Sequence, residues 1–295
     1  MKKIILIITV LFTVNIIAQD SKKNSTKDTI EVKKDKGLPL KAERKININT
    51  DEGTWMSLDI SPDGKTIVFD MLGDLYLLPI EGGNAKRITE GLAFDSNPKF
   101  SPDGEDLLFV SDRTGGPNVW IINLATKDST QVTKGDTYNI QAAEWTPDGN
   151  YIISSRGNRN VKLNMHHRDG GKGTILIKTP ANLKTVEPAF GKDERYIWYS
   201  KRTGSWQYNA KFPQYQLAKY DRETGKSKTM TSRYGSAFSP TLSSNGKWLV
   251  YGTRWNDKTG LIARELKTGS EKWLAYPIQK DDQESQATLG VLPAM

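Results

Sequence analysis

The chain has 295 residues, of which 36% are hydrophobic and 26% charged, and its formal net charge is +8. This composition is typical of a soluble protein. Residues 1–45 contain eleven Lys or Arg and five Asp or Glu, so the rest of the chain is nearly neutral. The folded part therefore lacks a basic footprint, which excludes nucleic acid as a partner. The absence of cysteine excludes a disulfide framework.

Residues 1–18 have the features of a secretory signal peptide. Two lysines follow the initial methionine, and residues 4–14 form a short, almost entirely apolar run. This run is shorter than the roughly 20 residues that a membrane-spanning helix needs. We therefore expect export with cleavage of the signal, a periplasmic or secreted protein, and no stable membrane span after cleavage. Residues 19–41 are polar and rich in lysine, which predicts a disordered basic leader.

A four-residue turn motif recurs along the rest of the chain. Ser61-Pro62-Asp63-Gly64 is followed by similar motifs at 101–104 and 146–149, and by weaker copies at 191–194 and 243–246, at spacings of 40 to 52 residues. Proline fixes φ at the first corner of such a turn, aspartate bonds its own backbone, and glycine accepts a positive φ. A repeat of this length is typical of propeller blades, with the motif joining the first two strands of each blade.

Short runs of apolar, aromatic and β-branched residues around each motif predict four strands per blade. The second strands are continuous apolar runs, such as residues 107–110, and such strands need cover on both faces. The predicted fold class is therefore all-β: a β-propeller of four-stranded antiparallel blades over residues 42–295. The five predicted blades span about 54–89, 97–133, 141–178, 186–231 and 238–275.

Both ends of the predicted array are incomplete. Residues 42–50 resemble a fourth strand without its first three, and residues 289–295 resemble the first strand of a further blade. These two pieces do not make one blade, so we expect the ring to be incomplete and the chain to be a fragment. The open faces of the first and fifth blades are then expected to be partly uncovered.

The sequence contains no recognisable catalytic or metal site. The two histidines, His166 and His167, are adjacent, so on a strand they point to opposite faces and do not chelate one ion together. No Gly-x-Ser-x-Gly elbow, phosphate-binding loop or paired metal-ligand spacing occurs. The glycine-rich segment 169–173 is interpreted as a turn before a fourth strand. The acidic segment 281–284 is interpreted as an exposed loop rather than a cation site.

Arginines recur just after four of the predicted second strands. In a propeller, the loops that follow second strands share one face with the connections between blades, so these side chains are expected on one rim. Their forked donors suit carboxylates, phosphates or an acidic partner. In the alternative, structural interpretation, each arginine pairs with an acid of its own or the next blade, such as Asp95 or Asp112. The long loop 202–214, which follows the second strand of the fourth predicted blade, is expected on the same face and contains aromatic residues. The candidate binding residues are Arg113, Arg156, Arg202, Arg254, Trp206 and Tyr208.

The repeat resembles that of TolB-type, WD-like propellers. The residues that show this resemblance are the strands and turns over 101–124. The same repeat is found in periplasmic TolB, in tricorn-type proteases and in prolyl oligopeptidase-like enzymes. Residues 52–60, 70–76 and 80–83 further resemble the start of secreted bacterial proteins in which a propeller precedes a metal-dependent amidohydrolase domain. Residues 281–295 resemble the link into their next blade.

The resemblance implies an accessory role, because the amidohydrolase chemistry of that family lies in a separate barrel whose ligands are absent from this chain. It implies a propeller that gates or docks substrate for a C-terminal catalytic domain, with a divalent metal only in that domain and no cofactor in this chain. The alternatives are a TolB-like module that binds a periplasmic protein or peptide, and the gating propeller of a serine peptidase.

Overall fold

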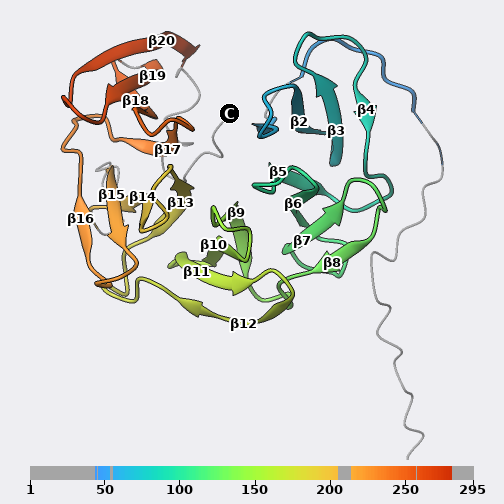
Figure 1. The fold of residues 1–295 in the computed structure, drawn as a ribbon, viewed down its shortest axis with the longest axis horizontal. Helices are drawn as coiled ribbons and strands as arrows, with labels where there is room; N and C mark the ends of the chain where they lie inside the picture. Colours follow the sequence, from blue (N-terminus) through green and yellow to red (C-terminus); the bar gives the residue numbers. More distant parts are fainter. Residues whose placement is uncertain (1–43, 45, 54–55, 205–213, 257, 281–295) are drawn as a thin grey trace, which may run out of the picture. The chain divides into compact units, whose positions relative to one another are not determined.

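The computed structural model describes residues 44, 46–53, 56–204, 214–256 and 258–280. They form five four-stranded antiparallel sheets that follow one another as the blades of a propeller (Figure 1). In blades one and two the strands are β1 Leu58–Ile60, β2 Thr66–Met71, β3 Asp74–Pro79, β4 Lys86–Arg87, β5 Asp95–Phe100, β6 Asp106–Ser111, β7 Asn118–Asn123 and β8 Ser129–Gln131. In blades three to five they are β9 Asn139–Trp145, β10 Tyr151–Gly157, β11 Lys162–His167, β12 Gly170–Ile175, β13 Thr185–Phe190, β14 Tyr196–Arg202, β15 Tyr215–Asp221, β16 Ser227–Thr229, β17 Phe238–Leu242, β18 Trp248–Trp255, β19 Lys258–Glu265 and β20 Glu271–Lys280.

The repeated motif is the turn between the first and second strands, as the sequence predicts. In blade one the Ser61 hydroxyl donates a 2.6 Å hydrogen bond to Asp63, whose carboxylate also accepts from the amide of Lys65. These donors hold the pKa of Asp63 below its ordinary value. Gly64 completes the turn with a φ of 72° and donates to the Ser61 carbonyl at 2.8 Å. Because the turn chemistry is local, it fixes the strand register of each blade.

The hydrophobic core lies between successive blades. Leu108 of blade two packs in one cluster with Trp145 and Ile152 of blade three, and Val68 of blade one packs in another with Leu107 of blade two. Every residue of β6 is buried, which confirms that second strands in the middle of the array are covered on both faces. Strand β2 of blade one is covered less completely.

The first strands lie innermost and carry a repeated β-bulge. Asn97, Glu187 and Ser239 each precede a proline and adopt φ values of 52° to 55°. The bulge turns the backbone amide of Asn97 toward Asp70 of blade one, at 2.8 Å, and that of Glu187 toward the Ser155 hydroxyl of blade three, at 2.9 Å. These bonds join the innermost strand of one blade to the second strand of the preceding blade.

Two predictions about local structure are wrong. The glycine-rich segment 169–173 is not a turn: β12 begins at Gly170 and pairs with β11, and the turn lies at residues 168–169. A β-carbon at Gly173 would lie 2.3 Å from Nδ1 of His166, so glycine is needed there for the strand to pass over the imidazole ring. Residues 46–50 do not form the expected fourth strand. A fourth strand pairs with the third strand of its blade, and in the described part of the chain the third strands of blades one and five, β3 and β19, already pair with β4 and β20. The predicted strand at 289–295 and the acidic segment 281–284 lie outside the described residues.

Candidate functional site

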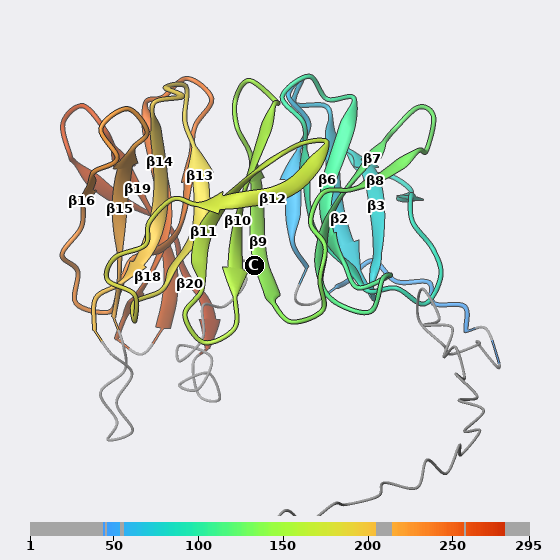
Figure 2. The same ribbon diagram turned by 90° about the horizontal axis from the view of Figure 1, so that it is seen from below.

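One face of the propeller, here called the connection face, carries the loops after the second strands together with the connections between blades. It forms the lower edge of the ribbon in Figure 2. Hydrogen bonds join the two kinds of segment: the amide of Phe94 donates to Asp112 at 2.8 Å, and the guanidinium of Arg156 donates to the Lys134 carbonyl at 3.3 Å. The opposite face, here called the turn face, carries the repeated turns. The predicted segregation of loops is therefore present.

Arg113 stabilises its own blade, as the structural interpretation predicts. Its guanidinium donates to both oxygens of Asp95 at 2.9 and 2.8 Å, and Asp95 is only 1% exposed. The guanidinium carbon also lies 5.0 Å from the ring centroids of Phe109 and Trp120, at cation–π distance. A charge that is paired and stacked in this way holds the loop to the blade and has little capacity left for a ligand.

The other candidate arginines are placed differently. Arg156 is half-buried, and its guanidinium carbon lies 4.5 Å from the ring centroid of Tyr138, in the connection that precedes blade three. Arg202 is 8% exposed and donates to the Gly204 carbonyl at 2.8 Å. Arg254 is half-buried, and its backbone amide donates to the Gly235 carbonyl at 3.1 Å. All four arginines lie at the connection face. Trp206 and Tyr208 lie outside the described residues.

The connection face also exposes large apolar side chains that the sequence reasoning missed. Tyr234 is 87% exposed, Leu72 73% and Phe94 61%. By contrast, the large apolar side chains exposed in the turns and strand ends of the turn face are Ile60 and Ile80 among the residues that the structure describes. Exposed apolar residues were not predictable from the repeat, because they stand in connections whose composition varies from blade to blade. The exposed apolar set of the connection face is Leu72, Leu92, Phe94, Tyr138, Tyr234 and Trp255.

Three charged side chains of the innermost strands meet near the turn-face end of the propeller. Lys99 of β5 lies 3.6 Å from Asp59 of β1 and 3.8 Å from Glu144 of β9. Burial raises the pKa of Glu144 to about 7 in spite of the nearby Lys99 ammonium. Burial alone would lower the pKa of Lys99, but Glu144 and Asp59 outweigh it, so that pKa is raised. Each of these residues stands two positions before a turn motif, a sequence signal that would have identified them.

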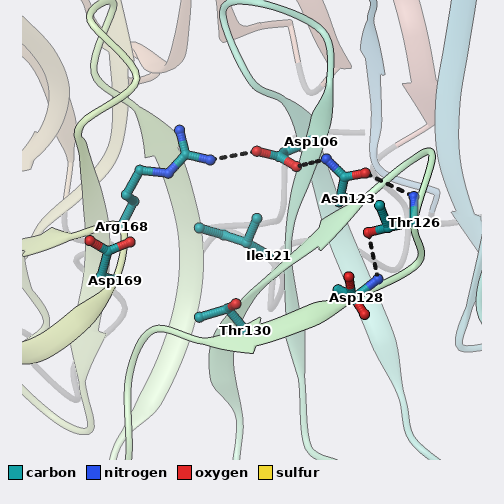
Figure 3. Close-up of a pocket in the computed structure, with 8 residues that line it drawn as sticks. All are labelled: Asp106, Ile121, Asn123, Thr126, Asp128, Thr130, Arg168 and Asp169. Atoms are coloured by element: carbon teal, nitrogen blue, oxygen red, sulfur yellow. Dashed lines mark hydrogen bonds and ion pairs between the residues drawn. The ribbon is translucent and has the colours of Figure 1, made fainter.

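A small pocket of about 270 Å³ lies on the turn face between blades two and three (Figure 3). Arg168 crosses from blade three and pairs with Asp106 of blade two at 2.5 Å, and Asn123 donates to the same carboxylate at 2.8 Å. Arg168 also lies 5.2 Å from the ring centroid of Trp145. The polar groups that define this pocket thus bond one another and join two blades.

The histidines behave as predicted for adjacent residues on a strand. His166 is 1% exposed, whereas the side chain of His167 is 47% exposed. Burial and the charge of Arg156 lower the pKa of His166 to about 4. Within the described ranges, no group of three His, Cys, Asp or Glu side chains is placed to hold a metal ion. No helical segment with the length and apolarity needed to cross a membrane occurs in the described part of the chain.

Comparisons with known proteins identify the repeat. A family model described as the TolB beta propeller domain matches residues 37–211. The Tol-Pal system protein TolB of Wolinella succinogenes is 28% identical over 167 residues, which cover 54% of this chain and 39% of that protein. Dipeptidyl-peptidase 5 of Porphyromonas gingivalis is 28% identical over 155 residues, covering 45% of this chain and 22% of that protein. The crystal structure of TolB from Acinetobacter baumannii is similar with a TM-score of 0.59 at 16% identity, covering 77% of this chain and 53% of that structure.

The matched part spans less than two-fifths of the length of either sequence relative. The likeness to the solved structure, at 16% identity, shows the fold alone. These relatives are a TolB protein and a peptidase, and they do not support the more specific resemblance to amidohydrolase-associated propellers. The family model covers more than half of the chain, and the five blades have the matching architecture. The chain therefore belongs to the TolB β-propeller domain family.

Proposed function

We propose that this chain is a non-catalytic, TolB-like propeller region of an exported protein and that it binds protein or peptide segments on its connection face. The observation that carries the proposal is that six exposed large apolar side chains lie on this face, three of them in the loops and connections of blades one and two. Soluble proteins seldom expose apolar side chains in groups, and aromatic residues beside arginines are enriched in protein–protein interfaces. The turn face offers no comparable set among the described residues.

The geometry of the connection face suits an extended or loop segment better than a small molecule. Its apolar side chains stand on separate connections and loops, with Phe94 and Tyr234 on different blades. Burial of even two or three such side chains contributes substantially to binding, since each large apolar side chain yields about 1.5–3 kcal/mol when fully buried. The signal-like residues 1–18 and the likeness to a TolB protein support export to the periplasm or beyond.

A second candidate is the gating propeller of a peptidase, which the similarity to a dipeptidyl-peptidase favours. In that case the connection face or the axial opening would meet a catalytic domain rather than a separate partner. A gating role beside an amidohydrolase domain is a further form of this proposal, supported only by the resemblance of residues 52–83. Reading the coding sequence after residue 295 would separate these forms: a His-x-His barrel would favour the amidohydrolase form, a Gly-x-Ser-x-Gly domain the peptidase form, and a stop codon the separate binding module.

The experiment is a selection of random peptides displayed on phage against the full chain. The test variant combines Phe94→Ser, Tyr234→Ser and Trp255→Ser. A matched control combines Ile80→Ser, Ile175→Ser and Leu274→Ser, three exposed apolar residues outside the connection face. We expect selected peptides to bind the parent chain and the control but not the test variant. Equal binding to both variants, with unaltered thermal unfolding, would contradict the proposal.

A further inference from the structure

We propose that the partner segment is acidic where it meets blades three and four, because the connection face is divided into a basic sector and an apolar, acidic sector. The inference rests on the proposed function and deepens it by naming the chemistry of the partner. The basic sector consists of Arg156, Arg159, Lys178, Lys184, Lys201 and Arg202.

The basic sector is built from elements that the fold brings to one end of two adjacent blades. Arg156 ends β10, Lys201 and Arg202 end β14, and Lys184 precedes β13 in the connection between the two blades. The amide of Arg202 donates to the Lys184 carbonyl at 3.1 Å, which ties the connection to the end of β14. These side chains therefore share one end of blades three and four.

The segments of blades three and four that carry these cations contain no carboxylate among the described residues, although the connection before β9, which Arg156 contacts, contains Asp136 near Lys134. Residues 156–168, 170–186 and 195–204 contain no Asp or Glu. Burial, and then the neighbouring charge of Arg202, lower the pKa of Lys184. The smaller of these two causes is repulsion between neighbouring cations, which an acidic ligand would relieve. The sector thus has a positive field that favours association with carboxylates.

Blades one and two present the opposite character on the same face. Residues 72–74, 87–95 and 112–117 contain four carboxylates and two arginines. Both arginines are neutralised within the protein, since Arg87 pairs with Asp74 at 2.8 Å and Arg113 pairs with Asp95 at 2.8 Å. The exposed apolar residues Leu72, Leu92 and Phe94 stand in this sector.

The two sectors together favour a peptide over a nucleic acid. A phosphate backbone is uniformly negative, so it would be repelled by Glu90 and Asp112, which form no ion pair with a described residue and stand beside the apolar side chains. A peptide can place carboxylates over blades three and four and apolar side chains over blades one and two. Complementarity of this kind fixes the orientation of a partner and speeds its association more than it increases affinity.

The test uses the same phage-displayed library and reads the composition of the selected peptides. The charge variant combines Arg159→Gln, Lys178→Gln and Lys184→Gln in the full chain. The matched control combines Lys172→Gln, Lys192→Gln and Lys228→Gln, which removes the same charge from exposed positions of the same two blades away from the connection face. We expect Asp and Glu to be enriched in peptides selected by the parent chain and the control, and not in those selected by the charge variant.

Binding of one selected peptide, made synthetically, gives the quantitative result. We expect the charge variant to bind the peptide about tenfold more weakly at low salt. Replacing the acids of the peptide by their amides should weaken binding to the parent chain by a similar factor. Both losses should be smaller at ~0.15 M ionic strength. Peptides that depend on Phe94 and Tyr234 but show no acidic enrichment would overturn this inference and leave the proposed function standing. Failure to select any peptide would overturn both. If single-stranded DNA with the same number of negative charges displaces the peptide, the surface binds any polyanion, and the inference is also overturned.

Discussion

Acidification should destabilise the protein through His166. This residue lies on β11, is 1% exposed, and neither ring nitrogen has a hydrogen-bond partner among the described residues. Its neighbour in the sheet, Gly173, passes so close that a β-carbon there would touch the ring. Protonation would place a charge in this site without an acceptor, and Arg156 adds repulsion instead of compensation.

The magnitude follows from the pKa of His166, which falls from 6.5 to about 4 on folding. The folded state therefore binds fewer protons than the unfolded state between these values, and stability decreases as the pH falls. The contribution is fully present above pH 6.5 and is lost by about pH 4. A shift of this size corresponds to about 3 kcal/mol, a substantial part of the 5–15 kcal/mol typical of folded proteins.

The assay is urea unfolding at a series of pH values for the parent chain, His166→Leu and His167→Leu. The difference in free energy of unfolding between the parent and His166→Leu should change by about 3 kcal/mol between pH 7 and pH 4, since only the parent loses stability by protonating this site. His167→Leu, which changes the exposed neighbour, should keep the pH dependence of the parent. Differences between variants are needed because Glu144, whose pKa is raised, contributes with the opposite sign. A pH-independent difference for His166→Leu would refute the reasoning.

Three further predictions concern stability and are measured by urea unfolding. Arg113→Gln leaves buried Asp95 without its cation and should cost about 3 kcal/mol, whereas a value near zero would indicate a free arginine. Leu108→Ala removes a fully buried side chain from the interface of blades two and three and should cost about 3 kcal/mol; a cost below 1 kcal/mol would mean that the blades do not pack as described. Gly64→Ala should cost about 1 kcal/mol because of its positive φ alone, since nothing lies within 4 Å of the added carbon. Gly204→Ala, with equally open space and no positive φ, is the matched control and should be close to neutral.

The propeller was predictable because its turns are determined by local chemistry. The side chains of Ser61 and Asp63 bond within the turn itself, so the motif has the same meaning wherever it occurs. The glycines at 170–173 show the limit of such reasoning. They read as a turn, but Gly173 is needed within a strand because His166 lies across the sheet from it.

The candidate site was predictable only in part. Topology alone placed the arginines on one face and offered Asp95 as a partner for Arg113. Exposure of Phe94 and Tyr234 depends on how the connections lie over the blades, and neighbouring residues in sequence carry no signal for it. The meeting of Asp59 with Lys99 likewise joins different blades, although the shared position before each turn motif places both on innermost strands.

The positions that depart from the repeat coincide with the division of the connection face. Blade one has Leu72 where other blades place an arginine after the second strand, and Leu72 is 73% exposed in the apolar sector. Blade two keeps its arginine but neutralises it with Asp95, so it adds no free charge there. Blades three and four keep their arginines, and residues 156–168, 170–186 and 195–204 contain no Asp or Glu. The repeat constrains the core and the turn face, whereas the exposed side chains of the connection face that bond nothing else in the blade can vary with little cost to folding. Variation that is organised into sectors of opposite character is therefore better explained by a partner than by stability.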